Sequence, residues 1–503
     1  MKKHNIFKVV LITLLVMVFL SWIFPAASFS NGYVEQERMQ VGLFDIFNYS
    51  ISSFSYFFHM FVYVLVIGGF YGVLNHISAY RKMLDKMAKT FKKAPKITIS
   101  VMVALLAILT SVGGFQLGLL IFVPMIISLI LLMGYDKVTA AIVIVGSLMV
   151  GIAGTTLGYN NTGVMSSILQ GLEFKSSMLF KIIVLVVGMA LVIMNALLYT
   201  RKSSTKKTNK KAAKTKKEVV SEETFVPAKV SARTKTSIVP LVVMISILFV
   251  ILLLSFMPWA GALKVKVFDN ITKSVASFKL FKFTIFDALL GEVVAFGQWT
   301  VIELSIVTLL VVLLTSFIYK MKFDDMIDNF VAGAKKALPT AVLVVLVYVC
   351  LVIATYHPFQ LYIYKVILDI TNGFNLVTGS IVAFLASIIN IEPLYTFQSA
   401  LPYIASITKP SDYNLVALVF QTIYGVTMLI APTSVILVAV LSYLGISYGK
   451  WLKTIWKLFL EMLLVALFVL IAMTNAVAAL ILLVCVVVIV VIATLVYKKV
   501  AKA

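Results

Sequence analysis

The sequence has little charge and few of the residues that build soluble catalytic or metal centres. Only 13% of its 503 residues are charged and 61% are hydrophobic, whereas soluble domains contain about 25% charged residues. The two cysteines, Cys350 and Cys485, both lie within apolar runs, so a disulfide framework and a cysteine zinc site are excluded. Four histidines occur without an H-E-x-x-H pattern, which leaves a zinc protease without support. A soluble globular protein and a disordered chain are therefore both excluded.

Acidic residues are also scarce, and two well-known motifs are missing. The chain has 20 acidic and 43 basic residues, which give a net charge of +23. It contains neither the G-x-x-x-x-G-K-[ST] phosphate loop nor the T-V-G-Y-G filter of potassium channels. In a soluble protein such a basic surplus would suggest nucleic acid. Here the surplus lies between apolar runs, where it sets membrane orientation, and we expect no nucleic-acid partner.

The abundant feature is a series of apolar runs of roughly 20 residues, the length of a membrane-spanning helix. The first run, Val9–Phe24, resembles a signal peptide, but its apolar part is at the long limit for one, so we expect an uncleaved span. The other expected spans are Tyr56–Val73, Met178–Leu198, Ile238–Phe256, Trp299–Tyr319, Val377–Ile389, Tyr413–Leu444, Trp456–Met473 and Val477–Val496.

Two apolar regions are too short or too interrupted to cross directly. The run Ile97–Thr110 falls short of the roughly 20 residues that are needed. We therefore expect a re-entrant pair of half-length helices near 97–133 and a second pair near 340–372, after a charged turn at 320–336. The predicted fold is all-α, a polytopic membrane protein with about ten transmembrane helices and two re-entrant hairpins.

Basic stretches divide the chain into four parts. Residues 1–200 form the first membrane half, 238–474 form the second, and 475–503 add a C-terminal helix with a basic tail. Between the halves, residues 201–237 carry 12 basic and 3 acidic residues without an apolar period, which is typical of a disordered cytoplasmic linker. Both termini and the 450–457 turn are expected on the cytoplasmic side. Charge counting leaves the side of the 320–336 stretch open.

Short matches suggest that the two halves arose by duplication. Phe44-Asp45 recurs as Phe286-Asp287, and Phe115-Gln116-Leu117 recurs as Phe359-Gln360-Leu361, at offsets of 242 and 244. Many secondary carriers are built from inverted repeats, with the substrate at the repeat interface. We therefore expect a two-repeat architecture of the inverted kind.

The breaks in the apolar runs are the candidate binding site. Helices interrupted inside a bilayer survive only when they are buried in protein or line a wet cavity. Their ends carry partial charges that attract ions, and glycine lets the backbone come close to a ligand. The alternatives are exposed loops with glycine caps and helix packing through small residues. The candidate residues are Gly113, Gly114, Gln116, Gly154, Thr155, Thr156, Asn160, Asn161, His357, Gln360, Asn390, Glu392, Pro432, Thr433 and Ser434.

Titratable residues at or near these breaks need separate explanations. Glu392 ends an apolar run, and a carboxylate at such depth must be neutral, paired or wet. It would bind a cationic substrate or carry a coupling proton, unless it is an interfacial carboxylate at a span's end. His357 could titrate near neutral pH, although packing or capping is the commoner role. Glu461 lies four residues after Lys457, so we expect an ion pair on one helix face.

Several short segments together resemble the YfcC-type carriers. These proteins belong with the anaerobic four-carbon-dicarboxylate carriers and the basic amino acid antiporter-like proteins of the ion transporter superfamily. The segments occur in the expected order from about residue 20 to 453. They are 21–29 (SWIFPAASF), 41–45 (VGLFD), 67–74 (IGGFYGVL), 134–136 (GYD), 151–156 (GIAGTT), 431–434 (APTS) and 445–451 (GISYGKW).

This resemblance implies a secondary carrier with two inverted halves, each with a re-entrant hairpin and a discontinuous helix. It implies basic amino acids, dicarboxylates or peptides as substrates, moved by an ion gradient or by exchange. The binding segments would be Gly113–Gln116, Gly154–Thr156 and Pro432–Ser434. Related carriers often form homodimers.

The chain departs from the family pattern where polar ligands would be held. Leu117–Leu120 replaces a paired acidic motif, and Leu394–Gln398 replaces a Ser/Gly-rich segment. Tyr424 and Met428 stand where the family usually has acidic and amide residues. These losses favour a larger or less charged solute.

The sequence therefore predicts a secondary active transporter of a small organic solute, amino acid or peptide preferred, in the plasma membrane. Its partners would be the solute and the lipid bilayer, and no cofactor is expected beyond a coupling proton or sodium ion. The alternatives are a dicarboxylate carrier and a degenerate carrier that acts as a non-transporting scaffold. A membrane enzyme would need titratable residues gathered at one depth, and the sequence offers too few.

Overall fold

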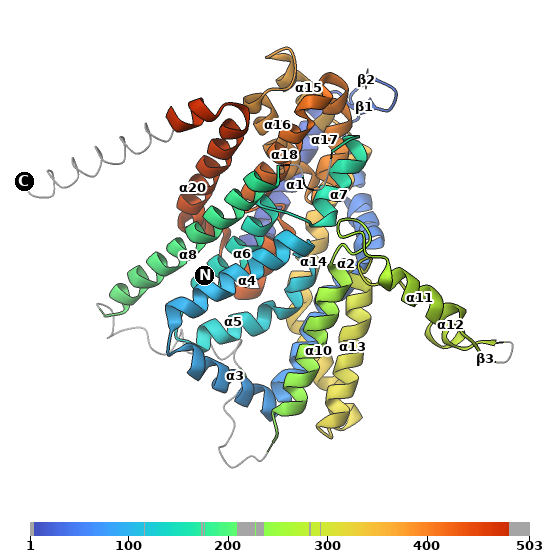
Figure 1. The fold of residues 1–503 in the computed structure, drawn as a ribbon, viewed down its shortest axis with the longest axis vertical. Coiled ribbons are helices and arrows are strands. Elements are labelled where there is room, and N and C mark those ends of the chain that lie inside the picture. Colours follow the sequence, from blue (N-terminus) through green and yellow to red (C-terminus); the bar gives the residue numbers. More distant parts are fainter. Residues whose placement is uncertain are drawn as a thin grey trace, which may run out of the picture.

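The computed structural model describes residues 5–114, 116–172, 175, 177–208, 227, 236–280, 283–291 and 293–481. Within them the fold is all-α, as predicted, apart from two short antiparallel hairpins, β1–β2 and β3–β4 (Figure 1). Most of the predicted disordered linker and most of the predicted last span, Val477–Val496, lie outside the described residues.

The first half of the chain contains nine helical elements and one hairpin among the described residues. They are α1 (Asn5–Ile23), β1 (Ala27–Phe29), β2 (Tyr33–Glu35), α2 (Leu43–His76), α3 (Ser78–Phe91), α4 (Pro95–Gly113), the 3-10 helix η1 (Gly118–Phe122), α5 (Val123–Leu132), α6 (Lys137–Ala153), α7 (Tyr159–Ile168) and α8 (Met178–Thr208).

The second half begins after the linker. Its elements are α10 (Val239–Phe256), α11 (Val267–Ser277), β3 (Lys279–Leu280), β4 (Phe283–Thr284), α12 (Ile285–Leu290), α13 (Val301–Ile318), α14 (Phe323–Tyr356), α15 (Gln360–Asp369), α16 (Leu376–Asn390), α17 (Pro393–Ile407), the 3-10 helix η2 (Pro410–Asp412), α18 (Tyr413–Thr427), α19 (Val435–Leu444) and α20 (Tyr448–Thr474).

Eight helices of the described chain are long and apolar enough to cross a membrane. They expose large apolar side chains on the outside of the bundle, such as Phe19 (65% exposed) and Phe317 (82% exposed). Such an apolar surface suits contact with lipid. The backbone suits it as well, because helices satisfy their hydrogen bonds internally. The eight helices are α1, α2, α4, α8, α10, α13, α14 and α20.

Contacts between loops define two sides of the bundle. The hydroxyl of Tyr319, after α13, donates to Ser237 O before α10 at 2.8 Å. Ser78, after α2, contacts the hydroxyl of Thr236 at 2.8 Å. We call this the linker side, and the stretch from Lys320 begins there. The opposite, far side carries β1–β2 and α15 (Figure 1).

The order of elements in the first half recurs in the second with opposite orientation. The series α1–α2–α3, α4–α5, α6–α7 and α8 corresponds to α13–α14–α15, α16–α17, α18–α19 and α20. The pair α4–α5 enters from the linker side, because it follows α3. The pair α16–α17 enters from the far side, where the ring of Tyr403 lies 5.6 Å from Tyr33 of β2. The structure thus has the two re-entrant hairpins and the inverted repeat of a secondary carrier.

Two predictions from the sequence were wrong: the position of the second hairpin and the offset between the two repeats. The hairpin expected near 340–372 is at 376–407. The reason is that α14 is one helix of 34 residues, which contains Pro339 and includes most of the predicted charged turn at 320–336. The equivalent helices α2 and α14 begin 280 residues apart, at Leu43 and Phe323, so the short matches at offsets of 242–244 do not mark the repeat. The first hairpin also differs, since α4 has 19 residues instead of a half-length. The turn expected at 450–457 is helical, within α20.

Small residues allow the equivalent helices α2 and α14 to pack closely along their length. A Cβ atom on Gly68 would lie 2.5 Å from the Cβ of Ala337, and one on Gly72 would overlap Asn329 O and lie 2.9 Å from the Cα of Gly333. Close backbone approach through small residues is the usual way in which membrane helices associate. This contact holds the two halves together.

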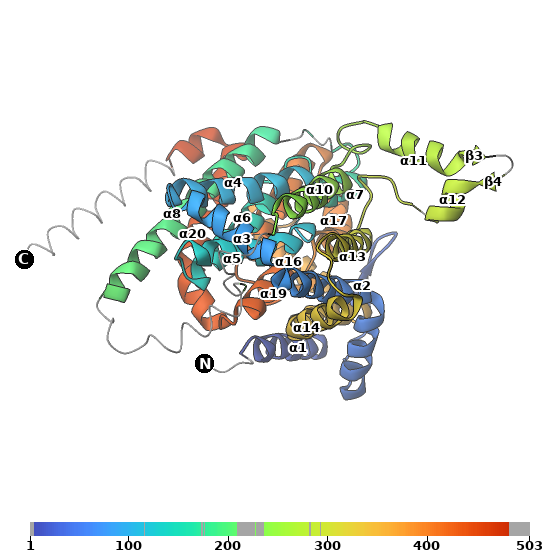
Figure 2. The same cartoon turned by 90° about the horizontal axis from the view of Figure 1, so that it is seen from below.

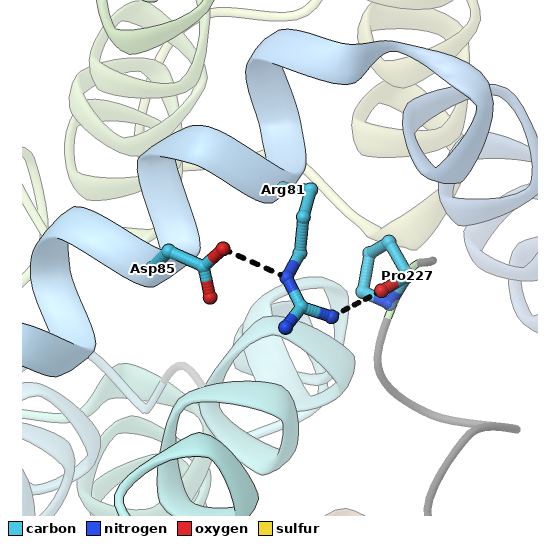
Figure 3. A network of polar contacts seen from close by, with 3 residues as sticks. All are labelled: Arg81, Asp85 and Pro227. Carbon is cyan, nitrogen blue, oxygen red and sulfur yellow. Dashed lines mark hydrogen bonds and ion pairs between the residues drawn. The ribbon is translucent and has the colours of Figure 1, made fainter. Parts of the chain in front are cut away.

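Polar contacts at the helix ends fix the surrounding elements. On α3, the guanidinium of Arg81 is buried, donates to Pro227 O of the linker and pairs with Asp85 at 3.0 Å (Figure 3). The expected ion pair between Lys457 and Glu461 is present at 3.4 Å.

Candidate functional site

Four interruptions of the helices converge inside the bundle. Two are the tips of the hairpins, between α4 and η1 and between α16 and α17. The other two lie within the broken spans, between α6 and α7 and between α18 and α19. Apart from α4 with 19 residues and α6 with 17, the broken helices have 15 residues or fewer, which is short of the roughly 20 that a full crossing requires. Their free ends therefore lie within the protein.

The break between α6 and α7 is held by the tip of the first hairpin. The N–H groups of Thr156, Leu157 and Gly158 all donate to Ser111 O, at 3.0, 3.3 and 3.3 Å, and the hydroxyl of Ser111 donates to Gly154 O at 2.7 Å. A Cβ atom on Gly158 would lie 3.1 Å from Gly114 N, so glycine permits this close approach. The backbone groups freed by the break are therefore satisfied by protein.

The break between α16 and α17 is strained. Ile391 has a φ of +68° and a ψ of −57°, the conformation of a γ-turn, which the hydrogen bond from Glu392 N to Asn390 O at 2.7 Å closes. A positive φ is an outlier for a β-branched residue and costs roughly 1–3 kcal/mol. The hydroxyl of Tyr424, on α18, donates to Ile391 O at 2.7 Å. The next residue, Glu392, accepts a hydrogen bond from the hydroxyl of Tyr348 on α14. Strain of this kind persists only where the surrounding structure fixes it.

The tip of the first hairpin, after α4, and the break between α18 and α19 are also fixed by specific contacts. Gly114 ends α4 in the left-handed conformation, with a φ of +69°. The hydroxyl of Tyr63, on α2, donates to Leu117 O at 3.2 Å and to Gly118 O at 3.0 Å. Ser434 caps α19, since its hydroxyl accepts from Leu437 N at 3.4 Å.

A cavity of about 180 Å³ lies where these four breaks meet. The first hairpin contributes Gln116 and Leu117, and the second contributes the segment from Ile391 to Leu394. The broken spans supply the remaining walls, which are Met149, Ile152, Val164, Tyr424, Met428, Ser434, Val435 and Ile436. The volume is below the roughly 300–1,000 Å³ of pockets for drug-sized ligands, so it suits a small solute and does not support the larger one expected from the sequence.

Two of the side chains that line this cavity, Gln116 and Glu392, carry hydrogen-bond acceptors. Glu392 is the one charged residue among the described lining residues, and no described ion pair includes it. The amide oxygen of Gln116 is buried and has no hydrogen-bond partner within the described chain. Buried polar groups are normally paired. The two acceptors therefore suit a ligand that brings its own donors.

A second, larger cavity opens toward the linker side. It has a volume of about 760 Å³ and is lined by Asn5, His76, Lys137 and Ser447, among others. The helix α19 runs between the two cavities, with Ile436 at the smaller one and Ala439 at the larger one. Three residues of helix rise about 4.5 Å, so roughly one helical turn separates the larger cavity from the site.

The structure brings only some of the predicted site residues to the cavity. Gln116, Glu392 and Ser434 line it, and Gly113, Gly114, Pro432 and Thr433 are their neighbours in sequence. Gly154, Thr155 and Thr156 lie behind its wall. The hydroxyl of Thr155 donates to Ile152 O at 2.7 Å, and a Cβ atom on Gly154 would lie 2.8 Å from the backbone of Leu185.

The remaining predicted residues lie elsewhere. His357 is on the far side, where its Nδ1 donates to Met39 O at 2.5 Å and its Nε2 shares a hydrogen bond of 2.7 Å with the hydroxyl of Tyr49. Gln360 donates to Ala354 O at 3.0 Å. Asn390 directly precedes the lining residue Ile391, but its amide donates to Ser399 at 2.9 Å. The side chains of Asn160 and Asn161 lie outside the described part of the structure.

Two residues that support the site escaped the sequence analysis. The amide of Gln421, on α18, donates to Ala153 O at 3.2 Å and to Thr155 O at 2.9 Å. Tyr348, on α14, donates to Glu392. The sequence did contain a signal for both residues, since each is a polar side chain within an apolar helix. Such residues usually face the interior of a membrane bundle.

Comparison with known proteins gives one family match. The family model described as DcuC, C4-dicarboxylate anaerobic carrier, matches residues 4–475. None of the curated proteins matches the chain.

Two solved structures are similar over most of the chain. The YdaH transporter of Alcanivorax borkumensis is 13% identical, with a TM-score of 0.39, and 94% of this chain and 98% of that chain are covered. MtrF of Neisseria gonorrhoeae is 12% identical, with a TM-score of 0.37 and coverages of 93% and 94%.

Proposed function

The chain belongs to the DcuC family of C4-dicarboxylate anaerobic carriers, and from this premise we propose that it is a secondary active transporter of a small amino-bearing solute, an amino acid or a short peptide. The family is one of carriers, and a carrier is a transporter and not an enzyme. The narrower YfcC-type assignment stays a prediction. We further propose the plasma membrane as its location and a proton or sodium gradient, or exchange, as the driving force.

The observation that carries this proposal is the chemistry of the central cavity. Its one charged described residue is Glu392, and the free amide oxygen of Gln116 is a second acceptor. An ammonium group has three donors and no acceptor, so it would satisfy both. Hydrogen bonds between charged partners are roughly twice as strong as neutral ones. A solute with an amino group therefore fits better than one with two carboxylates.

Transport also requires a route to the site from each side. The larger cavity reaches from the linker side to about one helical turn from Glu392 along α19. The two hairpins enter from opposite sides of the bundle and meet at the same cavity. Such an arrangement supports alternating access, in which one half moves against the other around a fixed site.

A C4-dicarboxylate is the second candidate, because the matched family is described by that substrate. The first turns of α17 and α19 lie at the cavity, and helix N-termini attract carboxylates. This substrate would require Glu392 to be protonated, so that its carboxyl group donates instead of repelling.

Transport by purified protein in liposomes tests the proposal. Amino acids, dipeptides and C4-dicarboxylates would be supplied as labelled solutes, with proton and sodium gradients imposed in turn. We expect uptake or exchange of an amino-bearing solute, reduced at least tenfold by Glu392→Gln. Glu461→Gln, in the Lys457 ion pair away from the cavity, is the matched control and should retain transport.

Other outcomes distinguish the alternatives. Uptake of dicarboxylates alone would replace the proposed substrate with the family's described one. If no solute of the panel crosses under any gradient, the transporter proposal fails and the scaffold alternative remains.

A further inference from the structure

Residues 257–299 form an arm that leaves the bundle between α10 and α13. Both views show α11, β3–β4 and α12 extending sideways, away from all other helices (Figures 1 and 2). The arm is fixed at its base, where Gly297 N donates to Ser255 O at 2.8 Å. Since α10 and α13 are both candidate spans, the arm starts and ends where they leave the membrane on the far side.

The helix α11 has an apolar face that no part of the described chain covers. Val267, Ile271 and Val275 recur at intervals of four residues and are 54%, 51% and 38% exposed. At 100° per residue these three side chains lie within one narrow stripe. The opposite face carries Asp269 and Lys273, with Ser277 beside them. No residue of α11 is buried.

Two further features identify the surface that would cover this face. An aromatic cluster marks the base of the arm, with the ring of Trp259 at 5.0 Å from Phe268 and the ring of Trp299 at 4.9 Å from Phe296. Tryptophan is enriched where membrane meets water. In addition, residues 257–299 carry five lysines and three carboxylates, and an exposed apolar stripe opposite a charged face is typical of a helix that lies in the plane of the interface.

We propose that the arm is a membrane-surface anchor, with the apolar face of α11 inserted between the lipid headgroups of the far-side leaflet. The occupant of this face is the bilayer itself. Insertion fixes the height and rotation of α10 and α13 relative to the lipid. The lysines on the arm favour anionic headgroups.

Spin labels on the full-length protein in lipid nanodiscs test this proposal. Cys350 is fully buried and can remain, and Cys485→Ala removes the other thiol. Single cysteines would be introduced as Ile271→Cys and Val275→Cys on the apolar face, with Lys273→Cys and Ser277→Cys as matched controls on the polar face. We expect the ratio of oxygen to nickel-complex accessibility to be several-fold higher at positions 271 and 275, and higher still in discs with phosphatidylglycerol.

A charge placed on either face separates insertion from a general effect of the substitutions. With the label at position 275, Ile271→Asp should abolish the lipid signal, whereas Ser277→Asp should preserve it. Equal accessibility on both faces would overturn the proposal, because the arm would then lie in water. Line broadening at position 271 that disappears on dilution with unlabelled protein would overturn it as well, because a second copy would then cover the face.

Discussion

Gln421 connects the two halves of the molecule at the level of a single side chain. It lies fully buried in α18 and donates two hydrogen bonds to carbonyls at the α6–α7 break, those of Ala153 and Thr155. These carbonyls have lost their helical partners because the helix ends there. A residue of the second half thus stabilises the break of the first half.

Replacing this residue should destabilise the protein without removing any group that lines the cavity. Gln421→Leu leaves two buried carbonyls without this donor, at a cost of about 1–3 kcal/mol. Thermal unfolding in detergent should show a clear fall in midpoint temperature. Gln398→Leu, at an exposed position of α17, is the control and should change little. An unchanged midpoint for Gln421→Leu would mean that water replaces the amide.

The sequence predicted the site residues that lie at breaks between helices, but not the supporting residues that lie inside helices. Gln116, Glu392 and Ser434 interrupt apolar runs and were predicted as site residues, and the structure places all three at the cavity. The binding role of these residues stays a prediction. Tyr348 and Gln421 were missed because their partners come from distant elements and become neighbours only after folding.

At the scale of elements, the close packing of α2 against α14 depends on glycine. The two helices belong to different halves and touch through Gly68, Gly72 and Gly333. The absence of side chains here lets dispersion forces act between backbones, which is the main attraction between helices in lipid.

A single added methyl group should therefore weaken this contact. Gly72→Ala would overlap Asn329 O, and overpacking typically costs about 1–3 kcal/mol. Gly449→Ala in α20 meets nothing within 4 Å and should be neutral or stabilising by up to about 1 kcal/mol. Unfolding midpoints of both variants check the expectation. Equal midpoints would show that α2 and α14 can separate freely.

The elements were predictable where apolar runs end sharply and unpredictable where polar residues continue a helix. The spans α10 and α13 begin and end within two residues of the expected bounds. The helix α14 was divided wrongly, because the charges before Lys336 and the proline at 339 resemble a turn. In the structure they continue one helix, with Asp324 and Asp325 in its first turn, where acidic residues are favourable.

For the whole molecule, the central feature is the meeting of four breaks from two inverted halves at one cavity. The sequence located three of the four interruptions as breaks and predicted the fourth, at Ile391, as the end of a span. It could not show that they converge, since convergence depends on how the hairpins enter from opposite sides. Glu392 and Gln116 come from different hairpins. A ligand that binds both hairpins would therefore lie at the interface of the two halves, where inverted-repeat carriers hold their substrates.

The most direct test of this account is a binding measurement in which the amino group of the ligand and the charge of Glu392 are removed, separately and together. The affinity of purified protein would be measured by calorimetry for each transported amino acid or dipeptide and for its des-amino analogue, with native protein and with Glu392→Gln. We predict that loss of the amino group weakens binding by native protein at least tenfold and has little effect on Glu392→Gln. An equal loss in both proteins would show that the amino group does not meet Glu392, and the account of the cavity would be wrong.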